Sequence, residues 1–240
     1  MVSRWVLAVA VVAGCTLVRA PAAAAQGQGS GLRPGRDSGS SAEVDPGGWI
    51  GRARAAMAAR DFDAAVDAAD SAAALGSDRS AVQLVVGQAY LSHARDHPSL
   101  GAIGKVKKGR AAVERAIELD PGNLDARTTL LQFLVQAPGL VGGSREGARA
   151  QAREIERRDR RRGLLARLDV AVADGKADEL GAVVDDAQPL FGLAAGDRAL
   201  MAAFLEAVRR VKDKRLRNEL TARLSAERTG AGRRRLDGRR

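Results

Sequence analysis

The stretch ERAIELDPGN, residues 114–123, marks the end of one helix and the start of the next. Ala116 is followed by an apolar-acidic stretch and then by Asp120-Pro121. Pro121 cannot continue a helix because it lacks a backbone N–H, and Asn123 offers a side-chain oxygen that can cap a new one. This order of residues predicts two successive helices joined by a tight turn.

The residues upstream follow the same design. Residues 49–76 fit two amphipathic helices that break near Arg60 and Asp61, and Asp61 is placed to cap the second helix. The apolar stripes have i, i+3, i+4, i+7 spacing and comprise Trp49, Ala53, Ala56 and Met57, then Phe62, Ala65, Val66, Ala69, Ala72 and Ala73. Small residues on both stripes predict a close crossing of the two helices.

Matching residues of this first unit and of a second unit are separated by fixed distances along the sequence. Ala53 is matched by Gly87, 34 residues later, and Ala65 is matched by Gly109, 44 residues later. The second unit therefore has ten extra residues between its helices, in the string HARDHPSLGAIGKVKK.

A third unit places its helices at 124–136 and 144–159, with Ser144 as the cap of the second helix and five extra residues in APGLVGGS. A fourth and less regular unit spans 164–187. Residues 198–226 are expected to close the array with one or two terminal helices.

A helix-turn-helix period of 34 residues resembles the tetratricopeptide repeat (TPR), and the resemblance covers residues 48–190. It implies an all-α fold, a TPR-like α-solenoid of antiparallel helix pairs with about three to four units plus terminal helices. Large aromatic residues at most packing positions are missing, as is the closing proline of units one and three. The alternative is a generic α-helical bundle whose alanine-rich helices imitate the repeat.

The resemblance also implies a binding site, because in such arrays the first helix of each pair lines a concave groove. The groove positions of this chain are Ile50, Arg54, Met57, Leu84, Gln88, Leu91, Thr128, Gln132 and Val135. They mix apolar and amide side chains, which suits a protein or peptide partner. Some family members clamp a C-terminal carboxylate with Lys, Asn and Arg. The matching places here hold Ile50, Arg54, Val85, Asp125 and Thr129, so we expect no such clamp.

The first 25 residues are expected to form a signal peptide. Arg4 precedes an uncharged apolar stretch from Trp5 to Gly14, and Ala23-Ala24-Ala25 satisfies the small-x-small rule for cleavage. The stretch is shorter than the roughly 20 residues that span a bilayer, although an uncleaved anchor remains the alternative. We expect a secreted, periplasmic or otherwise extracytoplasmic protein with no transmembrane span in the mature chain.

The string Val12-Ala13-Gly14-Cys15 resembles the lipobox of bacterial lipoproteins. Lipidation of Cys15 would anchor the protein to a membrane, so cleavage before Cys15 and cleavage after Ala25 both remain open. Residues 26–47 are rich in Gly, Ser and Pro and are expected to form a flexible linker. The folded helical domain is expected to cover residues 48–226.

Composition and motifs argue against catalysis. The chain has 240 residues with one cysteine and two histidines, which excludes an internal disulfide and nearly excludes a Cys/His zinc site. His93 and His97 have i, i+4 spacing but no evident third ligand, so we expect a solvated helix end and no metal. The string GLVGGS at 139–144 lacks the lysine of a P-loop and follows no predicted strand, which favours a flexible turn.

No Ser/His/Asp arrangement or carboxylate pair stands out from the solvated faces. We therefore expect a protein that is not an enzyme and needs no cofactor. A hydrolase whose catalytic groups lie far apart in the sequence is the remaining alternative.

The positive charge of the chain is concentrated near its C-terminus. Residues 141–240 carry 24 basic and 16 acidic side chains, with arginine-rich runs at 157–162 and 233–240. An exported protein meets little nucleic acid, and no aromatic residues are interleaved for base stacking, so we expect no nucleic-acid partner. Residues 227–240 are expected to be a basic, disordered tail that keeps the protein soluble or attracts an anionic envelope surface. A structural, envelope-tethering protein that uses this tail is the alternative function.

Overall fold

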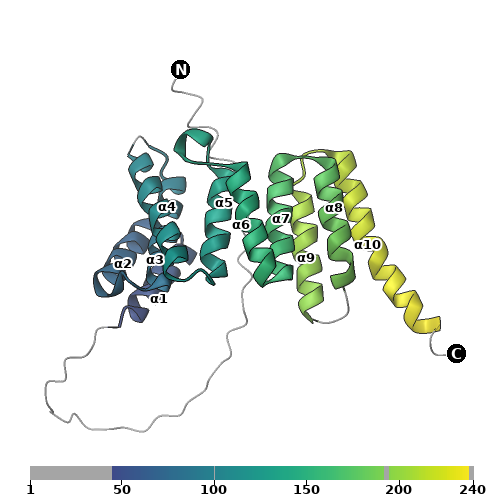
Figure 1. Cartoon of the computed structure of the whole chain (residues 1–240), viewed down its shortest axis with the longest axis horizontal. Helices are drawn as coiled ribbons and strands as arrows, with labels where there is room; N and C mark the ends of the chain where they lie inside the picture. Colours follow the sequence, from purple (N-terminus) through teal and green to yellow (C-terminus); the bar gives the residue numbers. More distant parts are fainter. Residues whose placement is uncertain (1–44, 100, 192–194, 238–240) are drawn as a thin grey trace, which may run out of the picture.

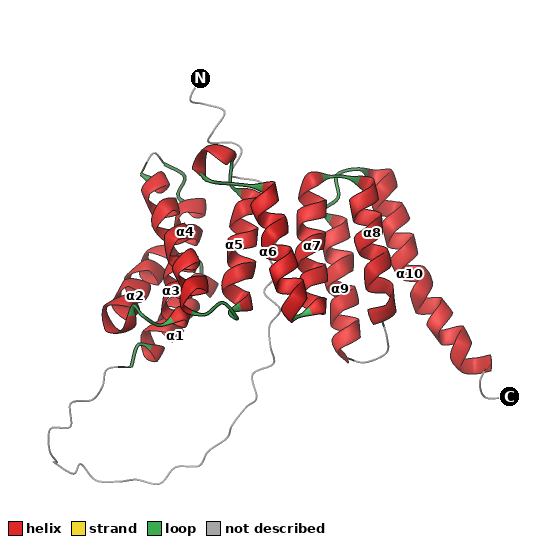
Figure 2. Cartoon of the chain, in the orientation of Figure 1, coloured by secondary structure: helices red, strands yellow, loops and turns green. Residues whose placement is uncertain are grey.

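The structure is a computed structural model that describes residues 45–99, 101–191 and 195–237, with side chains except at 195–196 and 226–237. The signal segment 1–25, Cys15 and linker residues 26–44 lie outside the described residues. The described chain folds into ten α-helices with no strand, which confirms the all-α fold (Figure 1 and Figure 2).

The helices are α1 (Gly47–Ala58), α2 (Phe62–Gly76), α3 (Ser80–Asp96), α4 (Ala102–Leu119), α5 (Leu124–Gln136), α6 (Arg145–Arg158), α7 (Arg160–Asp174), α8 (Ala177–Ala187), α9 (Ala195–Arg209) and α10 (Lys214–Asp237). Two 3₁₀ turns, η1 (Gly139–Val141) and η2 (Gln188–Leu190), lie in the connections after α5 and α8.

The helices pack in neighbouring pairs, and the odd-numbered helices form a continuous row. Contacts join α1 to α2, α3 to α4 and α5 to α6, as the three repeat units predict. Contacts also join α1 to α3, α3 to α5, α5 to α7 and α7 to α9. Figure 1 shows the resulting array, which runs from α1–α4 at one end to α7–α10 at the other. The architecture is therefore a repeat-like stack of helix pairs.

Side-chain caps begin five of the described helices, α2, α5, α6, α7 and α10, and three of these caps were predicted. Asp61 accepts a hydrogen bond from the backbone N–H of residue 64 at the start of α2, and Asn123 accepts one from residue 126 at the start of α5. Ser144 does the same for α6. Each side chain satisfies one of the backbone donors that a helix leaves unpaired in its first turn.

A single residue, Asp159, joins α6 to α7. Its backbone N–H donates to the carbonyl of Ile155 and ends α6, while its side chain accepts from the N–H of Arg162 and begins α7. The two helices consequently meet without an intervening loop.

The glycines at the predicted crossing of the second unit bring two helices into backbone contact. A Cβ atom added to Gly87 of α3 would lie 2.9 Å from the carbonyl oxygen of Gly109 and 3.1 Å from the backbone nitrogen of Val113, both on α4. A Cβ atom at Gly109 would lie 3.1 Å from the Gly87 oxygen. These distances leave no room for a side chain, so the crossing depends on both glycines.

Three hydrophobic clusters follow one another along the stack. The first joins α1, α2, α3 and α4, the second joins α3 to α7, and the third joins α7, α8, α9 and α10. Three helices belong to successive clusters: α3 and α4 to the first and second, and α7 to the second and third. On α3, Val85 packs in the first cluster and Leu84 in the second, and on α7, Val170 packs in the second and Leu168 in the third. The clusters are thereby linked through shared helices.

The helix bounds differ from the sequence prediction in two places. The extra residues of the second unit mostly lengthen its helices, because α3 continues to Asp96 and α4 begins at Ala102. The segment 227–237, expected to be disordered, continues the helical backbone of α10. Extending a helix whose earlier residues Leu220 and Leu224 are buried needs no new nucleus, and arginine favours helices.

Candidate functional site

The predicted groove residues lie on α1, α3 and α5, but they differ in how much surface they offer. Arg54 is exposed, and Gln88, Thr128 and Gln132 are half-buried. Leu84 is only 4% exposed and packs among α4, α5 and α6, so its assignment to an open groove was wrong. An apolar side chain at the boundary between two units packs against the neighbouring unit and is buried there.

The other apolar groove residues are half-buried at packing positions. Ile50 and Met57 pack against the first hydrophobic cluster, and Leu91 and Val135 pack against the second. Leu91 also approaches Gly109 at the close crossing of α3 and α4. These four side chains therefore contribute mainly to packing and border the exposed surface of the odd-numbered helices.

Polar side chains bridge successive odd-numbered helices. Gln88 of α3 donates to the Thr129 hydroxyl of α5 at 3.2 Å. Arg162 of α7 donates to Asp125 of α5 at 2.9 Å, and Arg161 of α7 contacts Asp197 of α9. We call the exposed and half-buried polar residues of this row the odd-helix face: Arg54, Gln88, Asp125, Thr128, Thr129, Gln132 and Arg162.

The odd-helix face combines amide, hydroxyl and charged groups. Thr128 and Thr129 each donate to the carbonyl four residues earlier in α5, while their hydroxyl oxygens can still accept. Val85, one of the places matching the carboxylate clamp, is completely buried, and Asp125 brings negative charge. The face therefore suits hydrogen bonds to a peptide backbone better than a free carboxylate.

A polar triad that the sequence did not reveal links α2, α3 and α4. The Tyr90 hydroxyl donates to Asp70 Oδ2 at 2.6 Å and accepts from Lys108 Nζ at 2.5 Å. Burial and the hydrogen bond to Asp70 raise the pKa of Tyr90. Burial alone would lower the pKa of Lys108, but its hydrogen bonds to Tyr90 and Asp70 outweigh burial and raise it. Both groups stay protonated at neutral pH, so the triad is a structural link and not a base–nucleophile pair.

Polar contacts of His93 also link α2, α3 and α4, and they contradict the prediction that this side chain is solvated. The His93 side chain is buried, with Nε2 2.8 Å from Asp63 Oδ1 and 2.7 Å from Lys105 Nζ, whereas His97 is exposed. The predicted solvated helix end is thus wrong for His93, because α3 continues past it and α4 covers it. The described residues contain no group of three or more His, Cys, Asp or Glu placed to hold a metal.

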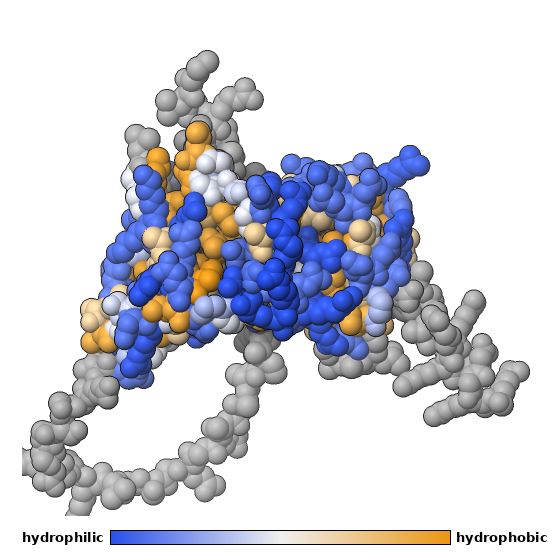
Figure 3. All heavy atoms as spheres, viewed as in Figure 1, coloured by the Kyte–Doolittle hydropathy of each residue, from blue (hydrophilic) through white to orange (hydrophobic). Residues whose placement is uncertain are grey.

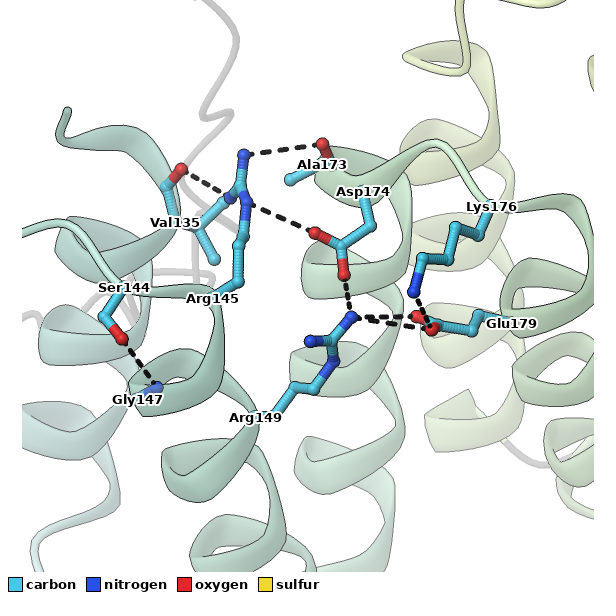
Figure 4. A network of polar contacts seen from close by, with 9 residues as sticks. All are labelled: Val135, Ser144, Arg145, Gly147, Arg149, Ala173, Asp174, Lys176 and Glu179. Carbon is cyan, nitrogen blue, oxygen red and sulfur yellow. Dashed lines mark hydrogen bonds and ion pairs between the residues drawn. The ribbon is translucent and has the colours of Figure 1, made fainter. Parts of the chain in front are cut away.

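Two arginines of α6 hold the end of α7, as Figure 4 shows. Arg145 donates to the carbonyl of Val135 at 2.6 Å and contacts Asp174 at 3.2 Å, and Arg149 contacts the other oxygen of Asp174. Arg149 also lies 3.4 Å from Glu179 of α8. Because the Asp174 side chain is only 8% exposed, this network ties α5, α6, α7 and α8 together.

The glycine-rich string 139–144 forms a hydrogen-bonded turn. The N–H groups of Val141 and Gly143 both donate to the carbonyl of Pro138, and Ser144 donates to Leu134. Gly142 has φ +99, a left-handed conformation that glycine adopts at little cost. The turn is therefore more tightly fixed than a flexible connection.

Comparison with known proteins finds no matching family model, no matching curated protein and no matching solved structure. None of the helices in the described part of the chain is long and apolar enough to cross a membrane.

Proposed function

We propose that this protein is a non-enzymatic scaffold of the tetratricopeptide type that works outside the cytoplasm and binds a protein or peptide on its odd-helix face. The observation that carries the proposal is the continuous row of α1, α3, α5, α7 and α9. In helical-repeat proteins, a row of this kind forms an extended surface with one helix from each unit.

The chemistry of the odd-helix face supports a peptide as the partner. Gln88 and Gln132 lie on neighbouring helices and carry amide groups that both donate and accept hydrogen bonds. An extended peptide offers backbone donors and acceptors along its length, and Arg54 adds a cation at the α1 end of the face. The flanking side chains Met57 and Val135 add apolar contact.

Site-specific photo-crosslinking in the native cell tests this proposal. A photoreactive residue at position 132 is expected to capture a defined partner, whereas one at Arg153, exposed on α6, is not. The double variant Arg54→Glu with Gln132→Ala should then reduce capture about tenfold, because an interface loses most affinity through a few central side chains. The charge-matched variant Arg153→Glu should leave capture unchanged. Equal capture from both positions would contradict the assignment of this face.

The arginine-rich residues 233–240 support a second candidate, an envelope tether that uses the basic C-terminus. Deleting residues 229–240 distinguishes the two functions. A tether loses its association with the cell envelope on deletion, whereas a peptide-binding scaffold keeps its crosslinked partner.

A further inference from the structure

The two segments that lengthen the second and third units meet in space. The first turns of α4 and the η1 turn enclose a shallow hollow of about 280 Å³, lined mainly by Ile103, Val106, Lys107, Arg110, Leu140 and Val141. Figure 3 shows hydrophobic atoms over the start of α4 and over η1. This surface, which we call the insertion surface, lies along the edge of the array where α3 connects to α4 and α5 connects to α6 (Figure 1).

A leucine is held out into solvent at the tip of the insertion surface. Leu140 is 85% exposed, and Ile103 on α4 is 42% exposed. The turn that carries Leu140 is fixed by its internal hydrogen bonds and by Arg110, which donates to the carbonyl of Gly142 at 3.3 Å. These hydrogen bonds fix the backbone of the turn in the conformation that leaves Leu140 exposed. Leu140 lines the hollow together with Ile103, Val106 and Val141, and a contiguous apolar surface of this kind is typical of an interaction site.

The net charge of the insertion surface is positive. Residues 102–110 of α4 contain four cations and no carboxylate, and residues 137–144 contain no charge at all. Lys105 and Lys108 contact His93 and Asp70, while Lys107 and Arg110 line the hollow. The carboxylate of Glu114 also lines it and pairs with Arg110 at 2.8 Å. Lys107 therefore leaves the rim with a net positive charge.

The geometry points to an anionic phospholipid surface as the ligand of this insertion surface, with Leu140 and Ile103 entering the bilayer interface and Lys107 contacting lipid phosphates. Interfacial binding combines buried apolar area with cations that attract anionic headgroups. The absence of charge in 137–144 lets the turn enter the interface without desolvating an ion. Internal hydrogen bonds pair the N–H groups of Val141, Gly142 and Gly143, which lowers the cost of moving this backbone into the interface.

A local fluorescence experiment on the full chain tests the proposal. An environment-sensitive dye is attached through Leu140→Cys in a Cys15→Ser background, and the matched control carries the dye through Leu75→Cys. Leu75 is exposed to a similar extent as Ile103 but lies at the far end of α2. Vesicles containing phosphatidylglycerol are expected to shift emission at position 140 to the blue and leave position 75 unchanged. Vesicles of phosphatidylcholine alone should produce no shift at either position.

Charge reversal supplies the second measurement. Lys107→Glu in the chain labelled at position 140 should raise the half-saturating concentration of anionic lipid roughly tenfold, because each cation near an anionic surface strengthens binding. Equal emission shifts at positions 140 and 75, or no shift at position 140, would overturn the proposal. A response at position 140 to a protein partner with none to vesicles would also overturn it and assign the surface to a protein. None of these results depends on the partner of the odd-helix face.

Discussion

At the scale of single residues, the stack depends on glycine and alanine where helices cross. Gly87 and Gly109 place the backbones of α3 and α4 in direct contact, and Ala53, Ala65 and Ala72 are completely buried in the first unit. A chain with few aromatic residues reaches a dense core in this way, because small side chains let helices approach closely.

The pair of glycines on α3 and α4 allows a matched test. Gly87→Ala is expected to lower the free energy of unfolding by about 1–3 kcal/mol, because the added methyl group forces the two helices apart. Gly104→Ala places the same methyl group on α4 where nothing lies within 4 Å, and should raise the free energy of unfolding by about 0.5–1 kcal/mol. Urea denaturation of both variants measures the difference. Equal effects would show that the close crossing does not govern stability.

Local signals explain which residues the sequence predicted correctly. The caps Asp61, Asn123 and Ser144 and the crossing glycines were predicted because capping and helical spacing depend on a few neighbouring residues. Leu84 and His93 were misplaced because their burial depends on helices more distant in the sequence. The exposure of Leu140 depends on the fold of its turn, which glycine-rich sequence alone does not specify.

At the scale of helices, polar bridges decide which elements stay together. The triad of Asp70, Tyr90 and Lys108 joins α2, α3 and α4, and Asp174 joins α6 to α7. Such links add specific geometry to helices whose buried apolar residues include many alanines. The sequence did not reveal them because their partners come from different helices.

The Tyr90 triad predicts a pH dependence. Tyr90→Phe should lower the free energy of unfolding by about 0.5–1.5 kcal/mol at pH 7, because it removes the hydrogen bonds to Asp70 and Lys108. The pKa values of Tyr90 and Lys108 are both raised, so the triad's contribution is complete below the unfolded values near 10 and is lost as pH rises through the raised values. Urea denaturation at pH 7, 9 and 11 should show the same wild-type advantage at pH 7 and 9 and a smaller one at pH 11. An advantage that persists unchanged at pH 11 would contradict this account.

At the scale of the whole molecule, the three hydrophobic clusters form a chain of neighbours. Leu168 belongs to the cluster of α7–α10, whereas Val85 belongs to the cluster of α1–α4, and the two clusters share no helix. In stacked-repeat proteins stability is close to a sum of units and nearest-neighbour interfaces. We therefore expect a substitution that destabilises one of these clusters to leave the helices of the other cluster unaffected.

Two core truncations test this arrangement. Leu168→Ala should cost about 2–5 kcal/mol, since its side chain is completely buried. Hydrogen exchange should become faster in α8, α9 and α10 and remain unchanged in α1 and α2. Val85→Ala should produce the opposite distribution, with faster exchange in α1 and α2. Faster exchange along the whole chain in both variants would instead identify a single cooperative unit.

The connections of the array differ in whether they can accept inserted residues, and the one-residue connection at Asp159 cannot. The segments between the crossing positions of α3 and α4, and of α5 and α6, hold extra residues relative to the 34-residue period, in longer helices and in the η1 turn, and the helices still form. The joint between α6 and α7 has one residue, which performs two capping roles at once. An added residue there has no loop to absorb it and would turn the buried stripe of α7 by about 100°. Diversity in this architecture can therefore accumulate at the edge that carries Leu140, while the α6–α7 joint keeps its length.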